Sequence, residues 1–576
     1  SAMSTTTSNV SSTSRAADAM TGRVHDLLLA AARARPDALA ILENGTRHVT
    51  WADLAEHAAC AADHLHDAGA GPGDRILLVS ENSVEATAFL FAASLIGASA
   101  VLANARLTEP EIARITDHCE PRVTILTTAA SDDAARHAAT LGARDITGSF
   151  GRAALLSLPD ARPNEPHDDP AQQTAMLLYT SGTTGTPKAA MMTHANMIAA
   201  GNAAAHQRDM TADDVVYLVL PTSHIFGAVV LMAVASRQCA CRLETRFSAE
   251  RLYDAVQQDV TVLPAVPQMH AHLFHYTETN DLPRPSGNRL KYVSSGGAPL
   301  DPAWKRKAEA FYGTAMQNGY GLTETAAGIC ATKNPIGDAD ISVGRPMLNC
   351  LVKLDMTVPG ATPDEGIGEI LAGGPQIASG YFRAPDLTAQ AFTEGGFFRT
   401  GDLGRFDDEG RLHISGRSKE LIIRSGFNVY PPEIEATLTD HPDVVMAAVI
   451  GRAIEGNEEV LAFAMVETRE AVGNIDEILA VEGLDGIFVG PADLSISWTD
   501  GALMEPATEE LQNVIATIAE KIVAAGKIAG IYVTETRDIG RYHTMGYRFI
   551  TCTSDLLLLQ TGIKSFVGAA RDQVGR

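Results

Sequence analysis

Residues 179–188 read Tyr-Thr-Ser-Gly-Thr-Thr-Gly-Thr-Pro-Lys and follow a short apolar run that starts at Thr174. The segment places two glycines and five Ser or Thr hydroxyls before a single lysine, Lys188. Small residues let backbone N–H groups approach an anion, hydroxyls add donors, and lysine adds positive charge. The segment therefore predicts a loop that binds a polyphosphate. Its spacing is not that of the Walker loop, and a flexible polar loop would have a similar composition.

The segments on both sides of this loop alternate between short apolar runs and helical stretches. Strands that are separated by helices of this length indicate βαβ units and a mostly parallel sheet. We therefore expect an α/β protein with two such blocks, one before the loop and one around and after it. The expected strands include Ala38–Leu42, Arg75–Val79, Ala98–Leu102, Thr174–Tyr179, Val215–Leu220, Val260–Leu263 and Arg289–Ser294.

The chain has 576 residues and a formal charge of −25, with 45 Lys and Arg against 70 Asp and Glu. Domains typically contain about 100–200 residues, so we expect two or three of them. A composition with 45% hydrophobic and 20% charged residues is typical of a globular protein. The acidic balance argues against a nucleic-acid-binding protein, which needs surplus Lys and Arg, but it does not exclude a single nucleotide site.

The sequence carries no strong signal for export, a membrane span or disulfide bonds. No apolar run reaches the roughly 18–20 residues that a membrane helix needs. Residues 1–15 lack the hydrophobic core of a signal peptide and predict a disordered leader or tag. Seven scattered cysteines do not form a disulfide framework, and Cys239 and Cys241 are expected in the core. We therefore expect a cytoplasmic protein.

Five further motifs follow the phosphate loop in order. They are PTSHIFG at 221–227, SGGAPL at 295–300, NGYGLTET at 318–325, FRTGD at 398–402 and GRSKE at 416–420. Together with the loop, these motifs resemble the adenylate-forming superfamily, which comprises acyl- and aryl-CoA synthetases, luciferases and the adenylation domains of peptide synthetases. The resemblance covers about residues 20–467.

This resemblance implies how the motifs would hold ATP. The loop would grip the β- and γ-phosphates, Thr323 would contact the α-phosphate, and Glu324 would bind Mg²⁺. Tyr320 would stack on the adenine, and Asp402 would accept both ribose hydroxyls. The other residues implied to contact the nucleotide are Thr180, Ser181, Gly182, Thr183, Thr184, Gly185, Lys188, Gly296, Gly297, Ala298, Asn318, Gly321 and Arg417.

Two further residues occupy positions with a role in that superfamily. His224 lies where the family places a gating residue beside the acyl site, and Lys419 lies where the small C-terminal domain hinges. Taken alone, each predicted residue also has a structural interpretation. Tyr320 would equally be a core aromatic, Asp402 a turn former, and His224 a buried, hydrogen-bonded histidine.

The implied reaction activates a carboxylic acid. The carboxylate attacks the α-phosphorus of ATP, pyrophosphate leaves, and the thiol of CoA then displaces AMP. The first step needs no general base, because the carboxylate is already ionised at neutral pH. Outside these motifs, the sequence resembles fatty- or aryl-acid CoA ligases more than peptide-synthetase domains. We expect Pro267–Leu273 to line the acyl tunnel. We interpret His270, His272 and His275 as structural, because no Cys, Asp or Glu lies beside them at ligand spacing.

From about Met465 the chain resembles the metal-dependent class II aldolases of the HpcH/HpaI type. Glu467 and Asp493 match the two carboxylates that bind a divalent cation in those (β/α)₈ barrels, and the amides of Gly490–Asp493 would meet a substrate carboxylate. Only the second half of a barrel is represented. The front half, with the catalytic His and Arg of that family, is missing, and Met465 replaces a Gln.

The strand expected at Val460–Glu467 fits both parts: the last strand of a truncated small domain and the first strand of the half barrel. A half barrel leaves open sheet edges, which must be covered by the synthetase part or by another copy, so a homodimer is one expected partnership. We therefore expect a leader (1–15), an adenylate-forming domain (16–415), a truncated small domain (416–466) and an aldolase-like half barrel (467–576).

The favoured function is an ATP- and Mg²⁺-dependent fatty- or aryl-acid CoA ligase. Because the family's catalytic lysine at the end of the small domain is not found, we expect its adenylation to be slow. Two alternatives stay open: a metal-dependent 2-oxo-acid lyase carried by the tail, and a non-catalytic nucleotide-binding fusion whose tail mediates association. The expected ligands are ATP or AMP, Mg²⁺, CoA and a small carboxylic acid.

Overall fold

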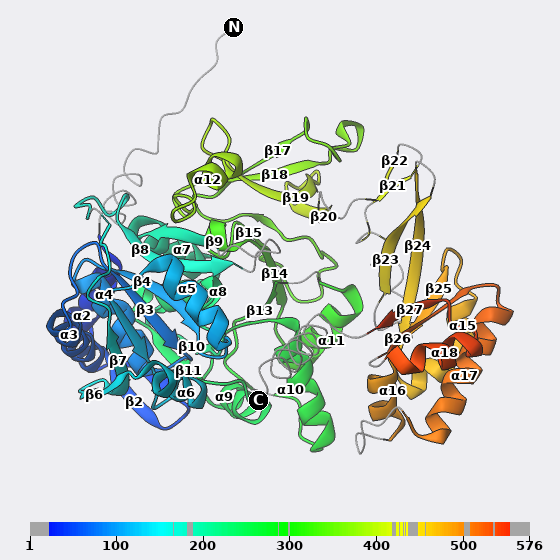
Figure 1. Ribbon diagram of the computed structural model, residues 1–576, viewed down its shortest axis with the longest axis horizontal. Coiled ribbons are helices and arrows are strands. Elements are labelled where there is room, and N and C mark those ends of the chain that lie inside the picture. Colours follow the sequence, from blue (N-terminus) through cyan, green and yellow to red (C-terminus); the bar gives the residue numbers. More distant parts are fainter. Residues whose placement is uncertain are drawn as a thin grey trace, which may run out of the picture. The chain divides into compact units, whose positions relative to one another are not determined.

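The computed structural model describes residues 22–164, 166–180, 188–285, 287–297, 300–417, 422–424, 427–429, 431, 434–435, 447–454, 457–499, 507–533 and 536–552. The chain divides into two compact units, the first ending at Ile414 and the second starting at Ser415 (Figure 1). The first unit contains two large sheets and part of a smaller third one, and the second unit contains a five-stranded sheet with helices and a two-stranded sheet, β21-β22.

A seven-stranded sheet carries the strand that leads into the phosphate loop. Its order is β6-β7-β5-β3-β4-β8-β9, and β5, β3, β4 and β8 are parallel. The parallel strands are mostly apolar and are buried along nearly their whole length, as expected for strands that are covered on both faces. The bounds are β3 Arg75–Ser80, β4 Ser99–Asn104, β5 Val123–Leu126, β6 Arg144–Gly148, β7 Gly151–Ser157, β8 Thr174–Thr180 and β9 Lys188–Thr193.

A nine-stranded sheet has the order β16-β15-β14-β13-β12-β10-β11-β1-β2, with a parallel run from β14 to β1. The strands predicted at Val215–Leu220, Val260–Leu263 and Arg289–Ser294 lie in this sheet, with their ends shifted by a few residues. The predicted blocks do not match the two sheets, because β8 pairs with β4 in the seven-stranded sheet and β1 pairs with β11 in this one. The bounds are β1 Leu39–Glu43, β2 Arg47–Thr50, β10 Val215–Leu218, β11 Ala240–Leu243, β12 Val262–Ala265, β13 Tyr292–Gly296, β14 Met316–Tyr320, β15 Cys330–Ala331 and β16 Arg345–Pro346.

Helices form layers around the two sheets (Figure 1). One large apolar core joins both sheets to α2 Val24–Ala34, α3 Trp51–Asp67, α4 Val84–Leu95, α7 His194–Gln207 and α8 Ile225–Arg237. The opposite face of the seven-stranded sheet packs against α5 Glu109–Cys119 and α6 Asp132–Leu141. The opposite face of the nine-stranded sheet packs against α9 Ala249–Gln258, α10 Pro267–Thr279 and α11 Pro302–Tyr312.

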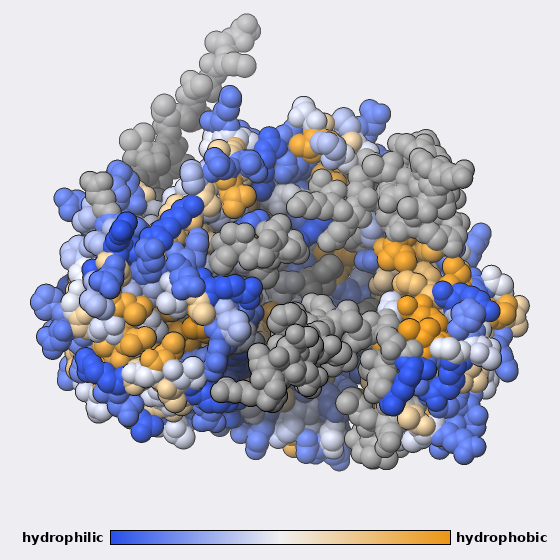
Figure 2. Space-filling model, in the orientation of Figure 1, coloured by the Kyte–Doolittle hydropathy of each residue, from blue (hydrophilic) through white to orange (hydrophobic). Residues whose placement is uncertain are grey.

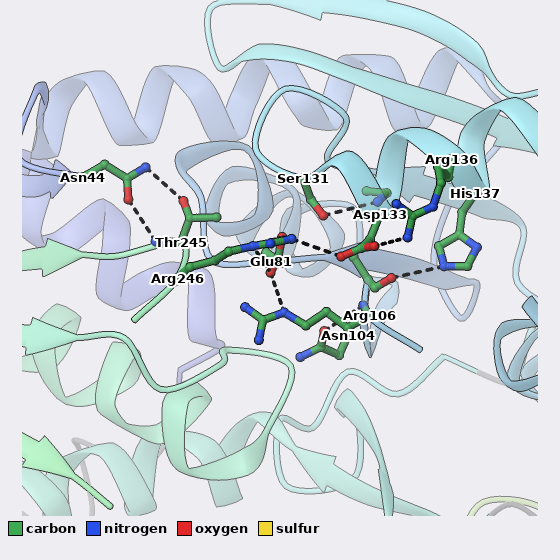
Figure 3. A network of polar contacts seen from close by, with 12 residues as sticks. Asn44, Glu81, Asn104, Arg106, Ser131, Asp133, Arg136, His137, Thr245 and Arg246 are labelled. Atoms are coloured by element: carbon green, nitrogen blue, oxygen red, sulfur yellow. Dashed lines mark hydrogen bonds and ion pairs between the residues drawn. The ribbon is translucent and has the colours of Figure 1, made fainter. Parts of the chain in front are cut away.

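A network of polar side chains ties the carboxyl ends of strands from both sheets together (Figure 3). Glu81, which follows β3, is almost fully buried and accepts hydrogen bonds from Arg106 and Arg246, which follow β4 and β11. Arg246 also pairs with Asp133 at the start of α6, 3.0 Å away. Next to this network, Asn82 donates to the Leu220 carbonyl and accepts from the Thr222 N–H. The network therefore fixes the loop that leads to His224.

A smaller antiparallel sheet follows, with the order β17-β18-β19-β20. Its strands are β17 Leu351–Asp355, β18 Gly368–Gly373, β19 Phe398–Phe406 and β20 Leu412–Arg417, and α12 spans Pro385–Ala391. A separate apolar core that includes Ile370, Phe398 and Leu412 holds this sheet to β15. The sheet carries Asp402 in β19.

The second unit contains a half (β/α) barrel. Its sheet has the order β23-β24-β25-β26-β27, and the four strands from β24 onwards are parallel. Helices α15 and α17 pack on this sheet in one core. The bounds are β21 Ile422–Arg424, β22 Phe427–Val429, β23 Ala447–Ile454, β24 Asn457–Val466, β25 Gly486–Val489, β26 Ile528–Val533, β27 Phe549–Cys552, α14 Arg469–Gly473, α15 Ile475–Leu479, α16 Pro491–Trp498, α17 Glu509–Ala524 and α18 Ile539–Met545.

One strand serves both parts of the second unit. β24 pairs antiparallel with β23 on one side and parallel with β25 on the other. β24 thus closes a hairpin with β23 and also opens the parallel run of the half barrel. That the hairpin is the end of a truncated small domain stays a prediction.

Candidate functional site

The phosphate loop connects two antiparallel neighbours. Thr180, the last residue of β8, pairs with Lys188, the first residue of β9, and residues 181–187 run between them. The Thr180 hydroxyl lies 3.5 Å from the Lys188 carbonyl. The two ends of the loop therefore lie at neighbouring positions of the sheet. The predicted residues Ser181, Gly182, Thr183, Thr184 and Gly185 lie outside the described residues.

Residues 378–382 run beside β9 and bring Glu324 next to it. Met191 donates its N–H to the Gly380 carbonyl, and Phe382 donates to the Ala189 carbonyl, each at 2.9 Å. From the same segment, the Tyr381 hydroxyl donates to Glu324 Oε1 at 2.6 Å. Burial, followed by the Glu324 carboxylate, raises the pKa of Tyr381 above its usual value, so the phenol stays protonated. The structure thus places Glu324 beside the strand that starts at Lys188.

Two parallel strands end side by side with the residues predicted to surround the adenine. Gly296, the last residue of β13, pairs with Gly319 in β14. Ligands of α/β folds bind at the carboxyl ends of parallel strands, so this edge is the expected place for a nucleotide. The amide of Asn318 donates to the Ser342 carbonyl at 3.0 Å, and its oxygen accepts from the Gly319 N–H. Its contact with the base stays a prediction, and Ala298 lies outside the described residues.

A short hydrogen bond joins the predicted adenine and ribose residues. The Tyr320 hydroxyl donates to Asp402 Oδ2 at 2.5 Å, and Asp402 is only 5% exposed. Burial, followed by the Asp402 carboxylate, holds the pKa of Tyr320 well above its usual value. Residues 82 positions apart in the chain therefore lie together at one edge of the first unit. Arg417 lies at the end of β20 in the second unit, and Lys419 lies outside the described residues.

The turn that carries Thr323 and Glu324 is tightly wound. It contains the 3₁₀ helix η1 Thr323–Thr325, followed by Ala326 and Ala327 with φ of 48° and 72°. Alanine seldom adopts a left-handed conformation, and such backbone strain clusters at functional sites. A Cβ added to Gly321 would lie 1.6 Å from the Ala327 carbonyl oxygen. Gly321 was predicted as a nucleotide contact; the structure shows that its missing side chain lets this turn close.

Comparison with known proteins identifies the fold. The sequence model of the AMP-binding enzyme family matches residues 28–382. The chain belongs to this family. A second model, HpcH/HpaI aldolase/citrate lyase, matches residues 421–561, so both resemblances are confirmed. Because that match also takes in β21 to β24, the predicted boundary between residues 466 and 467 stays a prediction.

Curated relatives of this AMP-binding enzyme are CoA ligases. The 2-succinylbenzoate–CoA ligase of Geobacillus kaustophilus is 33% identical over 428 residues, which are 72% of this chain and 82% of the relative. The sulfoacetate–CoA ligase of Cupriavidus necator is 32% identical over 76% of this chain and 86% of its own. A feruloyl-CoA synthase of Amycolatopsis is 32% identical over 73% and 84%. The chemistry is therefore that of an ATP-dependent, AMP-forming acid–CoA ligase.

Solved structures agree with this assignment. The crystal structure of ATP-bound MatB from Rhodopseudomonas palustris is 30% identical, with a TM-score of 0.65 over 80% of this chain and 93% of that chain. A fatty acyl-CoA synthetase of Mycobacterium tuberculosis is 27% identical, with a TM-score of 0.61 over 81% and 94%. The multi-subdomain α/β architecture expected from the sequence is confirmed.

In this AMP-binding enzyme, His224 caps the helix α8. Its Nδ1 accepts the Phe226 N–H at 3.2 Å, so the neutral ring carries its proton on Nε2. The ring is exposed to solvent, yet the protein around it lowers the pKa of His224 by desolvation. A Cβ on Gly296 would lie 3.1 Å from the Phe226 ring, so this loop adjoins the end of β13. His224 therefore lies near the predicted adenine edge.

Two other histidines are buried and neutral. His270 lies between the Tyr312 hydroxyl and the Ser294 carbonyl, at 2.8 and 3.1 Å, and burial lowers its pKa to about 4. His194 accepts the Val24 N–H, and burial lowers its pKa to about 3. Among the described residues, no group of three or more His, Cys, Asp and Glu could hold a metal ion. His270 is a core histidine, as the sequence interpretation had it.

We expect acid to destabilise the first unit through these histidines. The unfolded chain binds protons at His194 near pH 6.5 and the folded chain does not, so the free energy of unfolding falls as pH drops from about 6.5 towards 4, by up to about 1.4 kcal/mol per pH unit for each histidine. In urea titrations at several pH values, His194→Asn should show a shallower decrease, because Asn still accepts the Val24 N–H without titrating. An identical pH slope in wild type and variant would contradict this account.

The tail brings its two predicted metal ligands together. A Cβ on Gly490 would lie 2.8 Å from Glu467 Oε2 and 3.9 Å from Asp493 Oδ2, so the glycine leaves the space between these carboxylates open. Burial, followed by the Asp493 carboxylate, raises the pKa of Glu467. Two carboxylates fit a hard divalent cation in charge and donor type, but no third ligand lies beside them in the described part of the tail. Metal binding there stays a prediction.

No described helix combines the length and the apolar composition needed to cross a membrane. The visible face of both units is mostly hydrophilic, with hydrophobic residues gathered in patches on each (Figure 2).

Proposed function

We propose that this protein activates a fatty or aryl carboxylic acid with ATP and transfers the acyl group to CoA. One observation carries the proposal: the first unit brings together the two ends of the phosphate loop, Glu324 and the Tyr320–Asp402 pair. Each of these elements matches the nucleotide role that the family resemblance implies. The three CoA-thioester-forming relatives support CoA as the acceptor, and two of them act on aromatic acids by their names.

The residues of the site divide the work of adenylation. Lys188 places a cation where the loop would hold the β- and γ-phosphates, which eases the departure of pyrophosphate. Asp402 fixes the ribose, and the turn around Thr323 holds the α-phosphate in line with the attacking carboxylate. Such positioned charges and donors supply most of the acceleration in phosphoryl chemistry, because little covalent chemistry is left to the protein.

Glu324 fits Mg²⁺ by its donor chemistry. Mg²⁺ binds one or two protein carboxylates and completes its shell with phosphate oxygens and water. Tyr381 occupies Oε1 of Glu324, and no described residue donates to Oε2. A single available carboxylate oxygen beside a phosphate loop is therefore a suitable donor set. When bound there, the cation would neutralise phosphate charge.

The half barrel limits the reaction we expect. After β24 this chain continues into the half barrel, whereas the small domain of the family continues to its catalytic lysine. Losing one cation at developing phosphoryl charge lowers a rate by about 10²–10³-fold. We therefore propose that ATP and AMP bind normally and that adenylation is slow.

Pyrophosphate exchange with a panel of fatty and aryl acids tests this proposal. We expect acid-dependent exchange at about 10²–10³-fold below the rate of a related CoA ligase assayed in parallel. Exchange at the full rate would show that another lysine substitutes. Binding of ATP without any acid-dependent exchange would favour the non-catalytic fusion instead.

The tail supports a second candidate, a metal-dependent lyase. The adjacent Glu467 and Asp493 and the match to the HpcH/HpaI family favour it. Its test is proton exchange at the methyl group of pyruvate with added Mn²⁺ or Mg²⁺. Exchange that disappears in Asp493→Asn would establish the activity, and metal-independent rates would exclude it. Homodimerisation through the half barrel and a cytoplasmic location stay predictions.

A further inference from the structure

The segment 378–382 is fixed along its whole length. Ser379 donates its N–H to the Met191 carbonyl at 3.0 Å, and the Tyr381 N–H donates to the Thr388 hydroxyl of α12 at 2.9 Å. Phe382, 4% exposed, packs in the core that covers the outer face of the seven-stranded sheet. The segment thus runs antiparallel to β9 through an isolated bridge between Ala190 and Tyr381, with a buried anchor at one end.

The same segment holds Glu324 at two points. The Ala378 N–H donates to the Glu324 carbonyl at 2.8 Å, and the Tyr381 hydroxyl donates to Glu324 Oε1 at 2.6 Å. The backbone and the carboxylate of Glu324 are therefore both held by a segment that is hydrogen-bonded to β9. Since β9 begins at Lys188, the segment joins the phosphate loop to Glu324 through a continuous set of hydrogen bonds.

We propose that Tyr381 is a positioning residue, whose hydroxyl fixes one oxygen of Glu324 so that the other is presented to the Mg²⁺ that accompanies ATP. The inference rests on the proposed function and deepens it. A glutamate on a surface turn has several rotamers, and a hydrogen bond to one oxygen selects one of them before the cation arrives. Residues that hydrogen-bond to a metal-binding side chain without contacting the metal typically contribute about 10–100-fold to metal affinity.

The test compares Tyr381→Phe with wild type and with Tyr253→Phe. Tyr253 in α9 is a matched control, because its hydroxyl also donates a hydrogen bond, to the Pro283 carbonyl at 3.0 Å, and it is not one of the residues of the nucleotide site. Binding of Mn²⁺ to the ATP-saturated protein is measured by electron paramagnetic resonance. AMP binding without metal is measured by calorimetry, so that neither readout depends on turnover.

For Tyr381→Phe we expect Mn²⁺ affinity in the presence of ATP to fall by about 10–100-fold, while AMP affinity changes by less than about 2-fold. Tyr253→Phe should change neither. In a Glu324→Gln background, the Tyr381→Phe effect should largely disappear, because the two residues act on one interaction.

Unchanged Mn²⁺ affinity in Tyr381→Phe would overturn the inference, and so would an equal loss of AMP binding, which would mean that the hydroxyl supports the whole site. A full effect that persists in the Glu324→Gln background would also contradict it. Failure of the proposed function has a different signature: the wild-type protein itself would show no acid-dependent pyrophosphate exchange, whatever the Mn²⁺ affinities of the variants.

Discussion

Asp402→Ala should weaken AMP binding by about 10²–10⁴-fold. Two hydrogen bonds from ribose hydroxyls to a carboxylate would be lost, and hydrogen bonds to charged groups contribute about 1.5–3 kcal/mol each. The burial of Asp402, at 5% exposed, keeps water from replacing them at low cost. Titration calorimetry with AMP measures the change directly.

Two variants separate nucleotide binding from folding in this experiment. Asp407→Ala is the matched control, because Asp407 pairs with Arg411 and His413 in the β19–β20 turn, and AMP affinity should not change. Tyr320→Phe removes the hydroxyl that meets Asp402 and keeps the ring, so a smaller loss is expected. Unchanged AMP affinity in a folded Asp402→Ala protein would remove the ribose assignment.

Gly321→Ala should lower acid-dependent pyrophosphate exchange by at least about 10²-fold. The new Cβ would meet three backbone atoms, at 1.6 Å from the Ala327 oxygen, 2.5 Å from its carbon and 2.8 Å from the Gly328 Cα. Backbone cannot move aside as a side chain can, so the turn with Thr323 and Glu324 must shift. A misplacement of about 1 Å at a reacting centre costs on the order of 10²-fold in rate.

Gly71→Ala is the matched control for this substitution, since a Cβ there would have no atom within 4 Å. Its exchange rate and thermal midpoint should equal those of wild type. Gly321→Ala should keep its far-ultraviolet circular dichroism, because the clash is confined to one turn. Wild-type exchange in Gly321→Ala would show that the turn does not position reacting groups.

The sequence indicated those parts of the site that lie close together in the chain. The strand predicted before the hydroxyl-rich loop exists as β8, but the return of the chain to the sheet, with Thr180 paired to Lys188, was not predicted. The resemblance also named residues at the ends of β13 and β14, and the structure places Gly296 and Gly319 side by side there. Their contacts with a nucleotide stay predictions.

The remaining contacts depend on distances that no local pattern encodes. Tyr381 lies 57 residues after Glu324, in a stretch that resembles an ordinary loop, and only the edge pairing with β9 brings it there. The packing role of Gly321 could not be predicted, because a missing Cβ matters only once Ala327 is folded back onto it, and its predicted contact with the nucleotide stays a prediction. β24 was ambiguous because one strand pairs with partners of both parts.

The most direct test of the account is a crystal structure of the protein with ATP and Mg²⁺. The account predicts the β- and γ-phosphates at the loop that ends at Lys188, the adenine against Tyr320, and both ribose hydroxyls on Asp402. A nucleotide bound elsewhere, with no ribose hydroxyl on Asp402, would contradict it.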